Sequence, residues 1–251
     1  GMNDAPGITD WFNSLPLITR YWFGAAGGLT LAGNFGIVSP YKLIYDFPSV
    51  RGAFHVWRLL TSFLYVGSFS INTLMGLYML YQFSKQYEGG GPYNTGGGGG
   101  TADYLFCLLF GMAGCLACFH LLGGFIPIAP LFTRNLTFYV LYVWGRKNPN
   151  VDANIWGVPV KGMYLPFAYL ALNVLLGNPY WDILVGIGLG HVYYFLVDVF
   201  PLVYGKDLLH TPQFFIDQFG IGDYVPPVAP AGGYGGGGGG AGGVSRPGNV
   251  R

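Results

Sequence analysis

The sequence predicts an all-α, polytopic membrane protein, and two observations carry this prediction. Charged residues make up only 9% of the 251-residue chain, against ~25% in ordinary soluble domains. Long uncharged stretches recur along it, hydrophobic residues reach 52%, and the mean hydropathy is +0.42. A soluble domain of this length would need far more charge to cover its surface. The net charge of +1 gives no indication of nucleic acid as a partner.

Six apolar segments have the composition of transmembrane helices. In chain order they are Tyr21–Ser39, Leu59–Phe83, Tyr104–Leu122, a fourth segment ending at Trp144, Gly162–Leu176 and Ile183–Val197. A spanning helix needs about 20 apolar residues, so the uncharged stretch 104–133 is too long to be one helix. The glycines at 123 and 124 therefore mark a break near residue 122. Asp198 and Pro201 are expected to end the sixth helix.

The connections and termini are more polar or richer in glycine. Residues 1–20 predict an amphipathic lead-in on the membrane surface, before a membrane domain over 21–200. Within that domain, 152–161 predicts a polar loop. Residues 201–225 have the character of a soluble segment, and 226–251 are rich in Gly and Pro and are expected to be disordered.

The positive charges near the predicted helix ends indicate an orientation. Six lie on the side that holds both termini: Arg20, Lys85, Arg146, Lys147, Lys161 and Lys206. Four lie on the other side: Lys42, Arg51, Arg58 and Arg134. Because cytoplasmic loops carry the excess of Lys and Arg, we expect both termini in the cytosol.

The sixth predicted helix contains small residues next to a histidine. Gly186 and Gly190 are four residues apart, a spacing that lets a neighbouring helix approach closely. His191 follows directly, and an ionisable residue within a membrane span is a candidate functional residue. The alternatives are that the glycines serve packing only and that His191 is hydrogen-bonded inside the bundle.

A Gly-x-x-x-Gly-His sequence in a sixth helix resembles the rhomboid superfamily. There the resemblance implies a histidine that acts as general base for a serine at the start of helix four. This chain has no serine between Ser84 and Ser245, so the resemblance predicts no catalytic residue and no cofactor or metal. Arg134 and Asn135 stand near the expected serine position. Arg134 either faces a hydrated cavity or snorkels along a thinned bilayer.

The closer resemblance is to the derlins, a branch of this superfamily without the serine. The residues that carry it are Asp10-Trp11-Phe12, Thr19-Arg20-Tyr21-Trp22-Phe23, Trp57-Arg58, Ala102-Asp103-Tyr104-Leu105-Phe106, Tyr142-Val143-Trp144, Tyr164-Leu165-Pro166, Gly190-His191-Val192-Tyr193-Tyr194-Phe195-Leu196 and Thr211-Pro212-Gln213-Phe214. They extend from residue 10 to 215, which is nearly the whole of the non-repetitive sequence.

The resemblance implies a rhomboid-like bundle of six transmembrane helices in the endoplasmic reticulum membrane. It implies a non-enzymatic factor that returns misfolded proteins to the cytosol for ubiquitin-dependent degradation. The implied partners are misfolded clients, a ubiquitin-ligase complex, the valosin-containing AAA+ ATPase and further derlin copies in an oligomer. Several derlins end in a Leu-Gly motif that binds the ATPase. Residues 232–250 contain no such motif, so either the chain is truncated or the ATPase is recruited weakly or through a partner.

The same residues suggest a mechanism. We expect Trp57 and Arg58 to lie at the lumenal interface and to perturb that leaflet, the alternative being an ordinary interfacial anchor. We expect Arg134, Asn135 and His191 to line a hydrated groove in a locally thinned bilayer. The competing functions are an active intramembrane protease, disfavoured by the missing serine, and a small-solute transporter, disfavoured because no internal repeat is visible.

Overall fold

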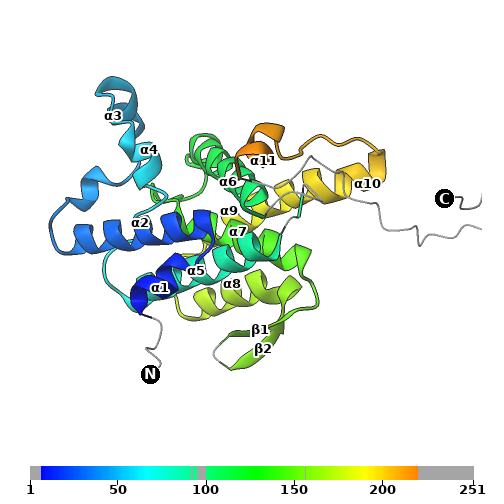
Figure 1. Ribbon diagram of the computed structural model, residues 1–251. Coiled ribbons are helices and arrows are strands. Elements are labelled where there is room, and N and C mark those ends of the chain that lie inside the picture. The colour runs from blue at the N-terminus through cyan, green and yellow to red at the C-terminus, as the bar shows by residue number, and fades with distance from the viewer. Residues whose placement is uncertain (1–6, 92, 95–99, 156, 220–251) are drawn as a thin grey trace, which may run out of the picture.

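The computed structural model describes residues 7–91, 93–94, 100–155 and 157–219, and most of the described chain is helical (Figure 1). The predicted disordered tail, residues 226–251, lies outside the described residues. The long helices are α2 (Leu17–Asn34), α5 (Ile71–Gly90), α6 (Gly100–Leu122), α7 (Thr133–Lys147), α8 (Leu165–Leu175) and α9 (Trp181–Tyr194). The shorter elements are α1 (Ile8–Asn13), η1 (Pro40–Lys42), α3 (Phe47–Gly52), α4 (Trp57–Thr61), η2 (Gly162–Tyr164), η3 (Phe195–Val199), α10 (Phe200–Tyr204), α11 (Gln213–Phe219), and the antiparallel strands β1 (Asp152–Ile155) and β2 (Val158–Lys161).

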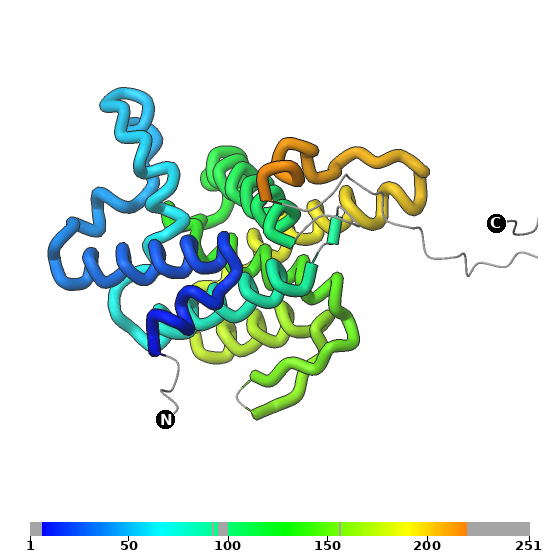
Figure 2. Tube along the Cα trace, viewed as in Figure 1, coloured from blue at the N-terminus to red at the C-terminus, as the bar shows by residue number. Residues whose placement is uncertain are grey.

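Helix α7 forms the centre of the bundle. Twelve of its 15 residues are buried, and it packs against α9, α5, α6 and α8. Helices α2 and α5 run side by side in opposite directions along one flank (Figure 2). A helix that is enclosed on all sides does not need a polar face. This explains why large aromatic side chains such as Tyr139 and Trp144 are accommodated all round it.

Two of the described helices are long and apolar enough to cross a membrane. They are α6 and the continuous helix Trp181–Tyr204, which joins α9, η3 and α10. Helix α8 has only 11 residues, about 16 Å at 1.5 Å per residue, against a hydrocarbon thickness of about 30 Å. The bundle therefore combines helices that match the bilayer with others, α7 and α8, that are shorter than its hydrocarbon thickness.

The prediction of one helix over Leu59–Phe83 is wrong. The chain leaves helical structure after α4 and re-enters it at Ile71. Gly67 has φ +127°, a conformation that other residues rarely adopt. The Ser70 side chain then accepts a hydrogen bond from the backbone N–H of Thr73, which caps the start of α5. No apolar pattern reveals such a break, because the residues around it are uncharged.

The predicted end of the sixth helix is also wrong, since the helix continues past Asp198 and Pro201 to Tyr204. Asp198 is paired with Lys147 at 2.6 Å, so its charge does not have to end the helix. A π-helical turn, η3, precedes Pro201, which enters at the start of α10, where its missing N–H costs little. Gly205, with φ +64°, ends the helix instead. The predicted polar loop 152–161 forms the hairpin of β1 and β2.

Residues 40–61 form an arm that stands out sideways from the bundle, roughly across the direction of α2 (Figure 1). Tyr45 holds its base. The backbone N–H of Tyr45 donates to the carbonyl of Pro130 at 2.9 Å, and its hydroxyl lies 2.7 Å from His120 Nε2 on α6. The arm therefore has a fixed attachment to α6 and the 123–132 segment.

The ends of α2, α5 and α6 meet at the other end of the bundle around Glu88. Its buried carboxylate accepts hydrogen bonds from the N–H groups of Ile18 and Thr19 and from the hydroxyls of Thr19 and Thr101. These N–H groups lie in the first turn of α2, where they have no partner within the helix. Glu88 therefore caps α2 from another helix and keeps the starts of α2 and α6 adjacent.

The segment after α10 folds back to this same end. Thr211 is fully buried, and its hydroxyl donates to Asp103 Oδ1 on α6 at 2.7 Å. Helix α11 packs against α6.

Candidate functional site

His191 has a hydrogen-bond partner on α7, and that partner is a tyrosine rather than a serine. Its Nδ1 lies 2.7 Å from the hydroxyl of Tyr142 on α7. Arg146 also donates from Nε to this hydroxyl at 2.9 Å, and its guanidinium lies over the Tyr142 ring. The sequence offers no serine between 84 and 245 that His191 could activate.

Gly186 and Gly190 lie where α9 crosses α7. A Cβ at position 186 would come 2.4 Å from the carbonyl oxygen of Asn135, and one at 190 would come 2.9 Å from Tyr142 Cβ. Gly188 lies between them and has nothing within 4 Å of a Cβ. The two helix backbones therefore approach most closely along the face that carries Gly186 and Gly190.

A groove with polar walls opens between α5 and α8, with α7 as its floor. Its cavity has a volume of about 130 Å³. Fourteen residues line it, and six of them are polar: Asn72, Thr73, Thr133, Arg134, Thr137 and Asn173. We call this the polar groove. At about 30 Å³ per molecule in the liquid, it has room for a few waters, and its side chains offer the partners that such waters need.

Arg134 is the charged residue among those that line the polar groove. It is the second residue of α7 and is half-buried. Its Nη2 donates to Asn173 Oδ1 on α8, while Asn173 Nδ2 donates to the carbonyl of Tyr169 at 2.8 Å. Asp182, at the start of α9, interacts electrostatically with Arg134. A guanidinium has five N–H donors, so this pairing leaves donors directed at the groove.

The three residues expected to share a hydrated groove do not lie together. Arg134 lines the polar groove, but neither Asn135 nor His191 is among the residues around it. Asn135 is fully buried, and its side chain faces the Asp182 carboxyl at the start of α9. His191 is exposed and faces Tyr142. Asn72 and Asn173 take their place in the groove. Each is a lone asparagine in an apolar segment, which was the sequence signal for a polar site, and the sequence analysis singled out neither.

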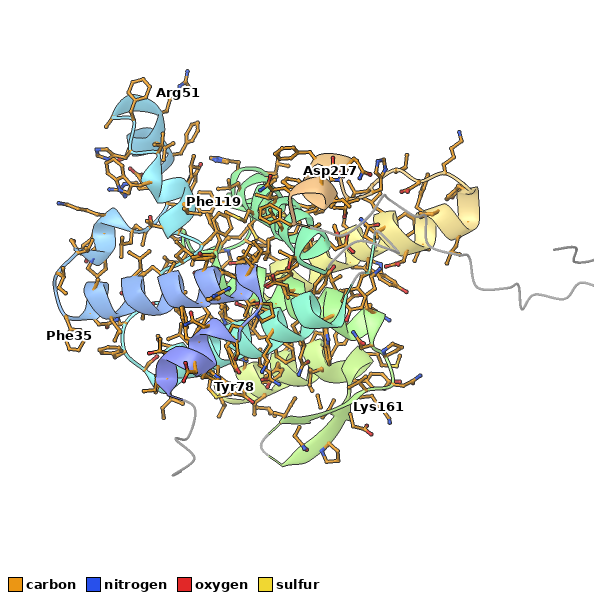
Figure 3. All side chains as sticks on the ribbon, viewed as in Figure 1. Phe35, Arg51, Tyr78, Phe119, Lys161 and Asp217 are labelled. Carbon is orange, nitrogen blue, oxygen red and sulfur yellow. The ribbon has the colours of Figure 1, made fainter. Side chains whose placement is uncertain are left out.

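The arm presents large apolar side chains to its surroundings. Tyr41, Phe47, Phe54, Val56, Trp57 and Leu60 are all exposed. Phe54 has φ +52°, a strained conformation for a bulky residue, and it is 78% exposed. Its neighbours Arg51 and Trp57 are exposed as well, with Arg51 at the outer end of the arm (Figure 3). Apolar and aromatic side chains mixed with cations are typical of a surface that lies in the interfacial layer of a membrane.

Arg58 stabilises the fold of the arm. Its Nη1 donates to the carbonyls of Tyr41 at 2.9 Å and Ile44 at 3.1 Å. Trp57, beside it, stacks on His55 with 4.4 Å between ring centroids. At the start of α3, hydrogen bonds from Ser49 hold the pKa of the Asp46 carboxyl below its usual range, so this cap stays ionised. Trp57 thus faces outward, whereas Arg58 ties the arm together.

Comparison with known proteins identifies the family. The model of the Der1-like family matches residues 15–213, which is most of the chain. This protein belongs to the Der1-like, or derlin, family. It is 37% identical over 230 residues to Derlin-1 of Arabidopsis thaliana, covering 89% of this chain and 83% of the relative. It is 34% identical to Derlin-2.1 of Zea mays over 91% of this chain and 93% of the relative, and 36% identical to Derlin-1 of Homo sapiens over 82% and 80%.

Membership of the derlin family implies a polytopic protein of the endoplasmic reticulum membrane with a role in endoplasmic-reticulum-associated degradation. Derlins are generally non-catalytic. The resemblance noted in the sequence is therefore confirmed at the level of the family.

Proposed function

We propose that this derlin is a non-enzymatic factor that moves misfolded proteins from the lumen or membrane of the endoplasmic reticulum to the cytosol. It does so with a rhomboid-like bundle in which α2, α5, α6, α7, α8 and α9 cross the membrane. The observation that carries the proposal is the polar groove between α5 and α8, which holds Arg134 and room for water. Six crossings would bring both termini to the same side of the membrane. We assign this side to the cytosol, because more of the Lys and Arg residues near the helix ends lie on it.

The polar groove lowers the barrier that a polar polypeptide meets in the bilayer. Unpaired peptide groups cost several kcal/mol each in hydrocarbon. Asn72, Arg134 and Asn173 offer them donors and acceptors from three different helices. The groove is bounded by α5 and α8, and exposed apolar side chains such as Leu74 and Leu175 flank it. A client therefore enters it sideways from the lipid.

The short helix α8 and the arm make the surrounding bilayer thinner. A helix about 16 Å long forces the hydrocarbon next to it to thin, since exposed polar ends are costly in lipid. The arm inserts Phe54, Trp57 and Leu60 into the lumenal leaflet, and Arg58 holds it in shape. Helix α8 thins the bilayer directly beside the polar groove, and the arm perturbs the lumenal leaflet next to α2 and α6.

The partners of this derlin follow from the proposed role. They are misfolded client proteins, membrane lipids, a ubiquitin-ligase complex and the valosin-containing AAA+ ATPase. We also expect this derlin to form homo- or hetero-oligomers with further derlins.

The test is a cycloheximide chase of a misfolded lumenal client in cells depleted of this protein and rescued with variants. Depletion should lengthen the half-life of the client several-fold, and wild type should restore it. The arm variant Trp57→Ala/Arg58→Ala should fail to restore it. The control is Lys161→Ala/Tyr164→Ala, a cation and aromatic pair that is exposed and lies outside the arm. A client half-life unaffected by depletion would refute the proposal.

A second arm of the experiment separates this role from proteolysis. His191→Ala removes the group that resembles a rhomboid base, and it should rescue the client as well as wild type does. The purified protein should leave a fluorogenic transmembrane peptide intact. Cleavage of that peptide, abolished in His191→Ala, would make the protein an enzyme and overturn the proposal.

A further inference from the structure

A second cavity lies on the opposite side of α7 from the polar groove, between α2, α4 and α6. Its volume is about 340 Å³, within the range of about 300–1,000 Å³ that ligand pockets occupy. None of its lining side chains is charged. The indole N–H of Trp22 in its wall donates to the carbonyl of Phe63 and is satisfied. We call this cavity the outer groove. It opens outward, because Tyr21 is 68% and Leu60 55% exposed.

The outer groove runs along the helix axes. Its lining extends from Ile18 to Ala25 on α2 and from Leu105 to Met112 on α6. Each stretch is about 10 Å long at 1.5 Å per residue. Both helices start at the same end of the bundle, since Glu88 binds Thr19 and Thr101 together. The groove therefore leads from that end towards the middle of the bilayer.

Arg20 stands at the end where the groove begins. Its guanidinium lies 5.9 Å from the centroid of the Tyr21 ring, which lines the groove. It forms no salt bridge with another described residue, and its Nε is buried without a hydrogen-bond partner. The nearby carboxylate of Glu88 is engaged by the backbone and hydroxyl groups of its neighbours. A cation with no carboxylate partner among the described residues therefore lies at the headgroup end of an apolar groove.

We propose that the outer groove binds one membrane glycerophospholipid, with an acyl chain between α2, α4 and α6 and its phosphate on Arg20. An acyl chain is thin, flexible and apolar, as the lining requires. Guanidinium and phosphate form strong, charge-assisted hydrogen bonds. The lipid thereby joins the arm to α2 and α6.

The first test uses native mass spectrometry of the full chain in detergent with added phosphatidylglycerol. Wild type should retain one tightly bound lipid. Leu109→Trp fills the groove from a position that is 44% exposed, and it should retain none. The control Leu121→Trp adds the same volume to the same helix at a 72% exposed position outside the groove, and it should bind as wild type does. Ala25→Phe, on the opposite wall, repeats the test if Leu109→Trp unfolds.

The second test separates the phosphate from the acyl chain. Arg20→Gln should weaken phosphatidylglycerol binding about tenfold, the loss of one charge-assisted contact. Lys85→Gln, an exposed cation on α5 outside the groove lining, should leave it unchanged. Diacylglycerol, which lacks the phosphate, should bind weakly and equally to wild type and Arg20→Gln. Equal lipid retention by wild type, Leu109→Trp and Ala25→Phe would overturn the proposal, as would a second copy of the chain as the bound species.

Discussion

Gly186 on α9 lies against the backbone of α7 at Asn135, where a Cβ would approach the carbonyl oxygen of Asn135 to 2.4 Å. No real Cβ sits this close to an oxygen, so any side chain at position 186 must push the helices apart. Gly190 repeats the contact one turn later, against Tyr142. The crossing of α7 and α9 thus depends on glycine at two positions of one helix face.

Gly186→Ala should lower the free energy of unfolding by about 1–3 kcal/mol, the usual cost of overpacking a tight core. Gly188→Ala is the matched control, because nothing lies within 4 Å of its Cβ. It should be neutral or stabilising by about 0.5–1 kcal/mol, since alanine favours the helix. Unfolding by denaturing detergent measures both variants. Equal stability of Gly186→Ala and Gly188→Ala would contradict the close crossing.

The Glu88 carboxylate gives a second prediction about stability. Glu88→Gln keeps the size of the side chain but replaces one acceptor oxygen by a donor that faces N–H groups of α2. We expect a loss of about 1–3 kcal/mol in the free energy of unfolding, the cost of unsatisfied buried polar groups. Asp217→Asn, an exposed carboxylate on α11, should change it by less than about 0.5 kcal/mol. Thermal unfolding in detergent compares the two, and similar losses would show that Glu88 does not cap α2.

Thr211 should determine whether the segment after α10 stays docked. Its hydroxyl donates to Asp103 at 2.7 Å and lies 3.2 Å from Asn94 Nδ2. Thr211→Val keeps the shape and removes both bonds, so amide hydrogen exchange in α11 should become about tenfold faster. Leu208→Ala, at an exposed position of the same segment, is the control. Unchanged exchange in Thr211→Val would mean that apolar contacts of α11 alone hold the segment.

The apolar pattern predicted a helix end correctly where the residues that end the helix follow it directly in the sequence. The predicted end of the third helix at Leu122 agrees with α6, because the glycines at 123 and 124 follow it directly. The start of α5 at Ile71 depends on a serine cap and a glycine conformation inside an uncharged stretch. The extension to Tyr204 depends on a partner for Asp198 that lies on another helix. Periodicity and charge contain no information about such pairings.

The polar residues of the candidate site were harder to assign for the same reason. Arg134 was singled out by its charge in an apolar segment, and it does line the polar groove. Its partner Asn173 lies 39 residues away on α8, and an isolated asparagine is an ambiguous signal. Asn135 neighbours Arg134 in sequence, but the two point to different sides of α7, since adjacent residues of a helix do not share a face. His191 lies beside Tyr142, and Tyr142 follows Arg134 by about two turns of α7.

The last prediction concerns Arg134, because a charged side chain within the membrane costs free energy and therefore needs a functional reason. Replacing it with leucine removes the cost of a half-buried cation but leaves Asn173 and Asp182 without their partner, so the free energy of unfolding should fall by about 1–3 kcal/mol. The substitution should also dry the polar groove and lengthen the half-life of a misfolded client several-fold. Arg134→Lys keeps the charge and should retain part of the activity. A variant that still folds but is inactive would separate function from folding.

Thiol labelling measures the water in the groove directly, because only the hydrated thiolate reacts. In a Cys118→Ala background, Leu172→Cys lines the polar groove, whereas Leu175→Cys is 83% exposed on the outer side of α8. A water-soluble maleimide should label position 172, and Arg134→Leu should slow that labelling about tenfold while it leaves position 175 unchanged. If labelling at 172 is as fast with leucine as with arginine at position 134, Arg134 does not keep the groove wet, and its effect on clients would have to come from direct contact with the moving chain.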